Sequence, residues 1–491
     1  MKRTISRRAG LLAIALILTT VLAGQTAIFA QEPVSGEQPP VLTATMKALL
    51  ADQQPAWNRA PQTATPCVAG FAGSYPCENV DLLAYLPLST FSAGGGNDSW
   101  GWTDPLTDKE YALMGLNNGT AFVDISDPEN PIYLGKLPTR TSNSTWRDIK
   151  VYNNYAFVVS EAGSHGMQVF DLTQLRNVPN PPVTFTQTTY YSGFGSAHNI
   201  VINEDSGYAY AVGTGTCSGG LHMVNIQTPT SPTNAGCFSA DGYTHDAQCV
   251  TYVGPDPDHQ GQEICFNANE DTLTIVDVSN KAAPAQVSRT GYANASYTHQ
   301  VWADETQTYL LLDDELDEDN YGFNTRTRVW DISNLDAPQL MGYYSGSTTA
   351  IDHNLYIKDG YAYEANYRAG LQILDLADIA NANLSQYGYF DIYPADNNAN
   401  FNGSWSVYPY FASGVVIISG IEQGLFIVRP NLPQPPCYDF NASGMVDVGD
   451  ISLVTAAWGT DNPLYDFNNS GTVDADDITT IALNWEAVCS L

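Results

Sequence analysis

Basic residues are scarce in this sequence of 491 residues. Lysine and arginine together number 19, against 52 aspartate and glutamate residues, so the formal net charge at pH 7 is −33. A surface this acidic repels the phosphates of nucleic acids, which excludes nucleic-acid binding as an expected function. The same balance suits calcium ions and a salty extracellular medium.

The sequence also lacks a long apolar run outside its N-terminus. There, the basic segment 2–8 precedes the apolar stretch 9–24, which is too short to span a membrane comfortably. This order is typical of a secretory signal peptide. The sequence therefore predicts a signal peptide over residues 1–30 and an N-terminal extension over 31–78. We expect the mature protein to be soluble and secreted, without a transmembrane segment.

The eight cysteines include no Cys-x-x-Cys pair, so neither a zinc knuckle nor a thioredoxin-like site is supported. An even number of cysteines in an exported chain is expected to form disulfides. Proximity in the sequence suggests the pairs Cys67–Cys77, Cys217–Cys237, Cys249–Cys265 and Cys437–Cys489. Free buried thiols are the alternative.

Two further catalytic patterns are missing. No Gly-x-Ser-x-Gly elbow stands before a helix, so a serine hydrolase site is unsupported. The glycine-rich stretch 213–220 carries no lysine and opens no evident helix, which argues against a phosphate-binding loop.

A repeat occupies the middle of the chain. Seven segments share a turn, an apolar strand, a polar residue and often a proline-containing turn. The polar position recurs every 44 to 54 residues, at Asp124, Asp171, Asn225, Asp277, Asp331, Asp375 and Arg429. Each unit also holds two earlier strands of alternating apolar residues. Four short strands in about 50 residues are typical of a propeller blade, so the sequence predicts an all-β, seven-bladed β-propeller over 79–430.

The two ends of this region are complementary. The stretch 80–91 resembles the fourth strand of a blade, and the last unit stops at Pro430 after its third strand. We expect the N-terminal strand to complete the seventh blade, because this arrangement hides a sheet edge. A stacked solenoid is the alternative, but it would not need such a pair of ends.

The repeat cores "FVDISDP" (122–128) and "TIVDVS" (274–279) resemble LVIVD repeats. The whole span 79–430 resembles the secreted bacterial proteins called choice-of-anchor B, in which a propeller is joined to varying C-terminal anchoring or docking modules. The resemblance implies secretion and attachment at the cell surface. It implies no particular reaction.

Two twelve-residue calcium-loop patterns, at 439–450 and 466–477, follow a proline-rich linker at 431–436. Calcium takes six to eight oxygen ligands, and ligands at positions 1, 3, 5, 7, 9 and 12 surround one point. The predicted ligands are Asp439, Asn441, Ser443, Met445, Asp447 and Asp450 in the first loop, and Asp466, Asn468, Ser470, Thr472, Asp474 and Asp477 in the second. Met445 and Thr472 would use backbone carbonyls. The alternative is a pair of polar loops that bind no metal.

Each loop ends in Asp rather than Glu, has no entering helix, and leads into a short amphipathic run. This strict duplication at a 27-residue offset resembles a dockerin, a small α-helical domain over 437–491. The resemblance implies two calcium ions and a cohesin-bearing partner, bound through the helices and through Val448, Gly449, Ala475 and Asp476. These residues depart from the Ser/Thr pairs of many dockerins, so a calcium-stiffened cap without a partner is the alternative.

Four of the seven histidines share one position in the repeat. When the blades are aligned on their first strands, this position holds Trp100, Arg147, His198, His245, His299, His353 and Trp405. First strands line the central channel of a propeller, so we expect the four histidines around one channel mouth. Polar residues at the exits of the second strands should approach the same face, namely Glu161, Asn267, Asn269, Asp313, Asp314, Glu364 and Asn366.

Two interpretations of the histidines remain open. Imidazoles beside carboxylates can bind a transition metal of unknown identity, or perform acid–base chemistry. Alternatively, each histidine hydrogen-bonds the backbone of the adjacent blade, which the usual role of repeated residues favours. The acidic run 313–320 is interpreted as a solvated segment, with calcium binding as the alternative.

These features predict a secreted, non-catalytic recognition or scaffold protein at the bacterial cell surface, whose propeller presents a face to a polysaccharide or another surface ligand. A polysaccharide hydrolase or lyase is the first alternative; its paired carboxylates would come from Glu161, Asp313, Asp314 and Glu364. A structural cell-surface protein is the second alternative.

Overall fold

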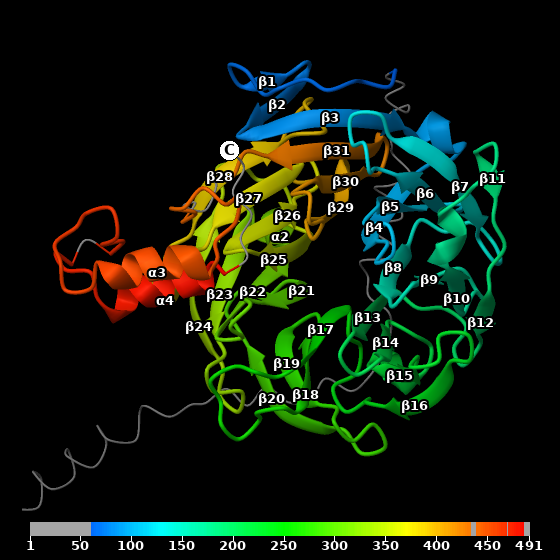
Figure 1. Cartoon of the computed structure of the whole chain (residues 1–491). Helices are drawn as coiled ribbons and strands as arrows, with labels where there is room; N and C mark the ends of the chain where they lie inside the picture. Colours follow the sequence, from blue (N-terminus) through cyan, green and yellow to red (C-terminus); the bar gives the residue numbers. More distant parts are fainter. Residues whose placement is uncertain (1–59, 434–437, 469, 486–491) are drawn as a thin grey trace, which may run out of the picture. The chain divides into compact units, whose positions relative to one another are not determined.

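The computed structural model describes residues 60–433, 438–468 and 470–485. The predicted signal peptide and the predicted pair Cys437–Cys489 lie outside these residues. Within 60–433, seven antiparallel sheets stand in a ring around a common axis (Figure 1). This arrangement confirms the predicted all-β, seven-bladed propeller.

Each sheet, or blade, contains four main strands, and the first strands of neighbouring blades contact one another around the axis. Blade 1 contains β4 (Gly96–Thr103), β5 (Glu110–Leu116), β6 (Gly119–Asp124) and β7 (Ile132–Pro138). Blade 2 contains β8 (Arg147–Tyr152), β9 (Tyr155–Ser160), β10 (Met167–Asp171) and β12 (Thr189–Tyr191). Blade 3 contains β13 (Asn199–Asn203), β14 (Tyr208–Val212), β15 (His222–Asn225) and β16 (Thr233–Cys237). Blade 4 contains β17 (Asp246–Thr251), β18 (Glu263–Ala268), β19 (Thr272–Asp277) and β20 (Ala285–Gly291).

The remaining blades follow the same order. Blade 5 contains β21 (Thr298–Ala303), β22 (Tyr309–Asp314), β23 (Arg326–Asp331) and β24 (Gln339–Ser345). Blade 6 contains β25 (Asn354–Lys358), β26 (Tyr361–Ala365), β27 (Leu371–Asp375) and β28 (Ser385–Phe390). Blade 7 contains β29 (Ser404–Tyr408), β30 (Val416–Gly420), β31 (Gly424–Pro430) and the N-terminal β3 (Val80–Pro87). A short strand β11 (Val183–Thr184) adds to the outer edge of blade 1, and the 3₁₀ turns are η1 (Leu88–Phe91), η2 (Leu172–Leu175), η3 (Cys217–Gly219) and η4 (Ile379–Asn381).

Inner strands are buried on both faces because each blade packs against its two neighbours. Every residue of β5 and of β30 is buried. Between blades 1 and 2, the rings of Phe122 and Phe170 stack with their centroids 4.7 Å apart. A strand buried on both faces carries a continuous apolar run, which explains why the repeat was visible in the sequence.

The repeated polar residue at the end of each third strand shapes the following turn. Asp124 Oδ1 accepts a hydrogen bond of 3.0 Å from the backbone N–H of Ser126, two residues later. The same bond recurs at 2.8–3.0 Å in blades 2 to 6, from Asp171, Asn225, Asp277, Asp331 and Asp375. Bonds of this kind form Asx turns. Arg429 has no acceptor atom to offer and lies within β31.

The ring closes through β3 as predicted. This strand pairs with β31 in antiparallel register from Val80 opposite Pro430 to Pro87 opposite Gly424. The first segment of the propeller therefore supplies the last strand of its seventh blade. The outer edge of β31 is therefore paired and not left open.

A hairpin before β3 was not predicted. It consists of β1 (Phe71–Ala72) and β2 (Tyr75–Glu78), and β2 pairs with β28 to extend blade 6. Cys67 and Cys77 form a disulfide at this hairpin. The predicted disulfides Cys217–Cys237 and Cys249–Cys265 are also present, and the latter joins directly opposed residues of β17 and β18.

The C-terminal segment contains two short helices, α3 (Val448–Ala456) and α4 (Ala475–Leu483). Both begin with a capping box, in which the N-cap aspartate and the third helical aspartate exchange bonds with each other's backbone. Their shared core contains Val446, Val454, Val473 and Ile481, all fully buried. Among the described residues, no helix is long and apolar enough to cross a membrane.

Candidate functional site

The structure brings the four predicted histidines together. His198 immediately precedes β13, His245 precedes β17, His299 lies in β21, and His353 precedes β25. The ring centroids of consecutive histidines are 4.3, 4.1 and 4.4 Å apart. The imidazoles of blades 3 to 6 therefore form a continuous stack at the start of the innermost strands.

Three of these histidines bind the next blade through Nδ1. His245 Nδ1 lies 2.9 Å from the carbonyl oxygen of His299, and His299 Nδ1 lies 3.1 Å from that of His353. His353 Nδ1 lies 2.6 Å from the carbonyl oxygen of Trp405. Because a carbonyl oxygen only accepts, each of these Nδ1 atoms carries the proton. This is the inter-blade hydrogen bonding that the second interpretation of the histidines requires.

Blade 1 does not place a tryptophan at the histidine position. Asp98 and Asp148 each accept a hydrogen bond from a backbone N–H of the following blade, at 3.1 and 2.6 Å. Because Asp98 and Asp148 make the same contact with the next blade, they hold the same position in their own blades. The residues just before them, Asn97 and Arg147, are therefore equivalent, and Trp100 is not equivalent to Arg147. The prediction for Trp100 is therefore wrong by three residues, because the pairing of β4 with β5 is irregular near the start of β4.

Trp100 instead belongs to a group of aromatic rings further along the axis. Its ring centroid lies 5.7 Å from that of Tyr356, which in turn lies 4.9 Å from that of Trp302. Lys150 Nζ lies 4.5 Å from the centre of the Trp100 ring. Side chains of blades 1, 2, 5 and 6 thus meet around Trp100.

Burial determines the charge of the stacked histidines. It lowers the pKa of His353 to about 3 and holds the pKa values of His245 and His299 well below their usual range. These three imidazoles are neutral at neutral pH. His198 differs because its Nδ1 lies 2.8 Å from Glu161 Oε1. Burial lowers the pKa of His198, but the hydrogen bond to Glu161 and the charge of Glu161 raise it. The pKa of His198 therefore lies above its usual value.

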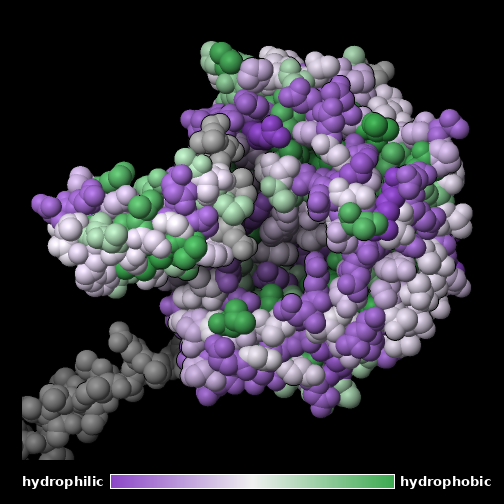
Figure 2. Space-filling view, viewed as in Figure 1, coloured by the Kyte–Doolittle hydropathy of each residue, from purple (hydrophilic) through white to green (hydrophobic). Residues whose placement is uncertain are grey.

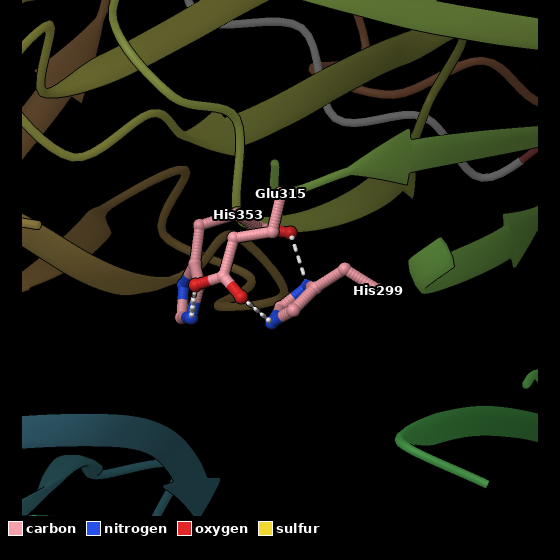
Figure 3. A group of neighbouring side chains, drawn as sticks. All are labelled: His299, Glu315 and His353. Atoms are coloured by element: carbon pink, nitrogen blue, oxygen red, sulfur yellow. Dashed lines mark hydrogen bonds and ion pairs between the residues drawn. The ribbon is translucent and has the colours of Figure 1, made fainter. Parts of the chain in front are cut away.

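Glu315 also belongs to this group, although no sequence pattern pointed to it by itself. It follows β22 and is only 1% exposed. Its Oε1 accepts a 2.6 Å hydrogen bond from Tyr367 Oη and lies 3.8 Å from His353 Nε2. Its Oε2 lies 3.8 Å from His299 Nε2, so the carboxylate stands between the two imidazoles (Figure 3). Burial raises the pKa of Glu315 to about 7.

Most of the acidic run 313–320 is buried and only Asp319 and Asn320 at its end are exposed, so its interpretation as a solvated segment is wrong. Five of its acids are at most 2% exposed: Asp313, Asp314, Glu315, Asp317 and Glu318. The run ends β22 and forms the short helix α2 (Asp317–Tyr321). Protein donors compensate part of the charge: Asp314 accepts bonds from the backbone N–H groups of Ser296 and Tyr297, and the Arg328 guanidinium pairs with Asp317. Burial, and then the charge of Asp352, raise the pKa of Glu318 to about 12.

The four predicted carboxylates do not form one cluster. Glu161 binds His198, and Asp313 Oδ1 lies 3.4 Å from His299 Nδ1. Asp314 is held by the backbone bonds described above. Glu364 accepts bonds from Thr327 Oγ1 (2.7 Å) and Asn366 Nδ2 (2.9 Å). Glu364 and Asn366 line a separate cavity.

This cavity has a volume of about 280 Å³ and lies at blades 5 and 6 beside the N-terminal hairpin. Its lining is polar and contains two tyrosines: Pro76, Thr325, Tyr344, Gly346, Ser347, Thr348, Glu364, Asn366, Ala369, Gln372, Gln386, Tyr389, Asp391 and Asn397. Amides, hydroxyls and aromatic rings in one cavity provide hydrogen bonds and stacking surfaces for a small polar ligand. The sequence did not predict this cavity, since its lining comes from β2 and from segments more than 200 residues away.

The first predicted calcium loop is tightly turned. Asp439 Oδ1 and Asn441 Oδ1 both accept a bond from the backbone N–H of Ser443, at 2.9 and 2.8 Å. Asp450 accepts bonds from the backbone N–H groups of Asn441 and Asp447. The second loop repeats this pattern at Asp466, Asn468 and Ser470, with distances of 2.9 and 2.9 Å. In both loops, the last aspartate accepts bonds from the backbone near the start of the loop and from the N-cap aspartate, so it joins the two ends of the segment.

The four predicted partner-binding residues lie at the first turns of the helices. Val448 and Ala475 are the first residues of α3 and α4, and Gly449 and Asp476 follow them. Val448 is 66% exposed. A side chain at Gly449 would meet the Asn441 amide at 2.4 Å, so the end of the Asn441 side chain would have to shift to make room for it. Figure 2 shows apolar side chains on the surface of this segment. Its exposed large apolar residues include Trp458, Leu464 and Leu483.

Comparison with known families finds LVIVD repeats in four segments, residues 109–139, 145–164, 266–290 and 353–387. A search of curated proteins finds no match. Among solved structures, the β-propeller domain of Cps50 (Swd1) from Myceliophteria thermophila is similar, with 11% identity, a TM-score of 0.43, and coverage of 65% of this chain and 93% of that one. A putative 6-phosphogluconolactonase from Bacteroides fragilis is also similar, with 12% identity, a TM-score of 0.42, and coverage of 59% and 86%. The protein thus contains LVIVD repeats within a seven-bladed β-propeller.

Proposed function

We propose that this protein is a secreted recognition protein of the choice-of-anchor B type, in which the propeller holds a surface ligand and a dockerin-like module attaches it to an extracellular assembly in a calcium-dependent way. The observation that carries the proposal is the pair of turned loops, 439–450 and 466–477, with their matching hydrogen bonds. The three disulfides fit the oxidising medium outside the cell.

The donor set of each loop fits calcium. It comprises three carboxylates, one amide oxygen, one hydroxyl and one backbone carbonyl, all of them hard oxygen ligands. Asp439, Asn441, Ser443, Met445, Asp447 and Asp450 would hold one ion, and Asp466, Asn468, Ser470, Thr472, Asp474 and Asp477 a second. Asp450 and Asp477 also cap their helices, so bound calcium would fix each helix to its loop.

Calcium titration of the full chain tests this part. We expect two ions to bind, and the variants Asp450→Ala and Asp477→Ala each to lose one of them. Asp461→Asn, which removes an exposed charge outside both loops, is the matched control and should keep both ions. If the two loop variants bind calcium like the control, the attachment proposal is wrong.

The partner is proposed to be a cohesin-bearing protein. Val448, Gly449, Ala475 and Asp476 would contact it together with the exposed apolar side chains of the same segment. Binding to a panel of purified cohesin domains, with calcium and with EDTA, tests the proposal. Val448→Lys should abolish calcium-dependent binding, because it places a charge at an exposed apolar position without touching a calcium ligand.

The propeller is proposed to recognise a polysaccharide unit in the cavity at blades 5 and 6. Tyr344 and Tyr389 supply rings for stacking, while Gln372 and Gln386 supply amides. We expect binding on a polysaccharide array to weaken about tenfold or more in Tyr389→Ala, the loss typical of a central aromatic contact. Tyr321→Ala, at an exposed tyrosine outside the cavity, is the control. Release of sugar in the same assay would favour the enzyme alternative.

A further inference from the structure

His299, Glu315 and His353 form a compact group of metal-binding side-chain types. One ligand atom from each lies within 4.8 Å of the other two. The three residues are 1%, 1% and 3% exposed. They come from neighbouring blades, 5 and 6, so the ring closure of the propeller brings them together.

The tautomers of the two histidines are fixed by the backbone. Nδ1 of His299 donates to the carbonyl of His353, and Nδ1 of His353 donates to the carbonyl of Trp405. A neutral imidazole has one N–H, so both Nε2 atoms carry lone pairs. Metal-binding histidines commonly show this arrangement, in which a backbone carbonyl holds the nitrogen remote from the ion.

The lone pairs of both Nε2 atoms face a carboxylate. Glu315 Oε1 is 3.8 Å from one and Oε2 is 3.8 Å from the other. Tyr367 Oη donates to Oε1, but Oε2 is buried and has no hydrogen-bond donor among the described residues. Two lone pairs and an unpartnered carboxylate oxygen therefore meet in a buried space without a proton donor between them. Such a group is costly unless a cation satisfies it.

We propose that His299 Nε2, His353 Nε2 and a Glu315 carboxylate oxygen bind one divalent transition-metal ion, of which zinc is the simplest representative. Two imidazoles and one carboxylate are a donor set that suits zinc and iron and leaves further coordination positions open. This inference is independent of the calcium loops and of the cavity.

The group must contract to hold an ion. Ligand atoms about 2.1 Å from one zinc ion are separated by roughly 3.4 Å. The two nitrogen–oxygen separations are 3.8 Å, each to a different Glu315 oxygen, and the three ligand atoms lie within 4.8 Å of one another. Tyr367, whose hydroxyl holds Oε1, is a positioning residue. His245 Nε2 belongs to the next ring in the stack, at a centroid distance of 4.1 Å from His299, and is the nearest histidine beyond the set.

A proton on Glu315 is the competing explanation. It would let the carboxyl donate to one Nε2, but one proton satisfies only one of the two lone pairs. The variant Glu315→Gln separates the explanations, because its amide can donate to an Nε2 atom while it provides no anionic ligand. The variant should therefore fold as well as the natural protein and lose the metal.

The test is metal retention by the full chain without an affinity tag. The protein is stripped with chelator, incubated with zinc in excess calcium to saturate the C-terminal loops, and analysed for metal after gel filtration. We expect about one zinc per chain, reduced at least tenfold in Glu315→Gln and in His353→Gln, with Tyr367→Phe weakened about tenfold in affinity. Cobalt in place of zinc should give visible absorption bands that both ligand variants lose.

The control variant is His259→Gln. It disrupts the other described group of metal-ligand side chains, Asp256, His259 and Asp336, and should retain the zinc of the propeller channel. The unfolding temperature of each metal-free variant shows that it folds. Absence of retained zinc in the natural protein would overturn the proposal, as would zinc retained by Glu315→Gln or lost by His259→Gln.

Discussion

His165 and Arg147 show how a buried side chain in this propeller depends on its charge state. His165 Nδ1 donates to the carbonyl of Gly166 at 2.9 Å, and its Nε2 accepts from the Arg147 guanidinium at 3.1 Å. Arg147 holds the repeat position that carries histidine in blades 3 to 6, and its Nε donates to the carbonyl of Leu116 in blade 1. A protonated imidazole would not fit this arrangement. Both of its nitrogens would be donors, so Nε2 could no longer accept the bond from Arg147.

The charge of His165 should therefore make stability depend on pH. Burial, and then the charge of Arg147, lower the pKa of His165 to about 4. The unfolded chain takes up this proton first, so stability falls as pH falls from 6.5 toward 4. The shift corresponds to up to about 3 kcal/mol. Urea unfolding of His165→Gln between these pH values should show a smaller loss than the natural protein; an equal loss would contradict the assignment.

At the scale of elements, the ring closure by β3 and the disulfide Cys249–Cys265 join different pairs of strands. The strand β3 joins the start of the propeller to its end through β31. The Cys249–Cys265 disulfide joins β17 and β18, which are already paired in one blade. The first contact is non-local and organises the ring, whereas the second restrains a single hairpin with a sequence separation of 16.

Removing β3 should open the ring. A chain that begins at residue 88 leaves the outer edge of β31 without a partner and exposes the side chains that pack on Leu82 and Tyr85. We expect aggregation and loss of a cooperative thermal transition, measured by light scattering and circular dichroism. A chain that begins at residue 60 keeps all described strands and is the control. A stable monomer beginning at residue 88 would disprove the closing role of β3.

Removing the Cys249–Cys265 disulfide should cost less than opening the ring. The double variant Cys249→Ala, Cys265→Ala is expected to lose about 3 kcal/mol of unfolding free energy, as closure of a loop of this length predicts. It should remain folded, because the β17–β18 pairing persists. Guanidinium unfolding measures the loss, and an unchanged midpoint would show that the crosslink contributes nothing.

At the scale of the whole molecule, charge is the dominant feature. A net charge of −33 repels itself in the compact state. Burial, and then the charge of Asp352, raise the pKa of Glu318 to about 12, so this acid of the run 313–320 is protonated at neutral pH and does not add to the repulsion. Charge on this scale keeps the protein soluble but lowers its stability at low ionic strength.

Salt should therefore stabilise the protein. Raising sodium chloride from about 0.01 M to 0.15 M shortens the screening length from about 30 Å to about 8 Å. At a fixed calcium concentration, we expect the unfolding temperature to rise by a few degrees. Differential scanning calorimetry measures this shift. A fall in the unfolding temperature would indicate that attractive ion pairs, such as Lys281 with Glu263, outweigh the repulsion.

Part of the site was predictable because it repeats. The histidines were found because one position recurs in four blades, and the closing strand because a blade needs four strands. Glu315 was not predicted as a site residue, because it lies in the acidic run 313–320, which resembles a solvated segment. The hairpin at 71–78 was not predicted, because its partner strand β28 lies about 310 residues later in the chain. No local sequence pattern indicates such a distant pairing.

The sequence by itself determined the strands, the seven repeats and the two C-terminal loops, since each depends on spacing between nearby residues. The sequence also predicted that the four histidines lie around one channel mouth, but the tertiary structure decided which other side chains meet them. It placed His299, Glu315 and His353 around one point and buried five acids of the run 313–320. It also set Asn97, and not Trp100, at the repeat position that carries the histidines. The physical reason is that neighbouring blades contact through residues about 50 positions apart, and only closure of the ring fixes their separation.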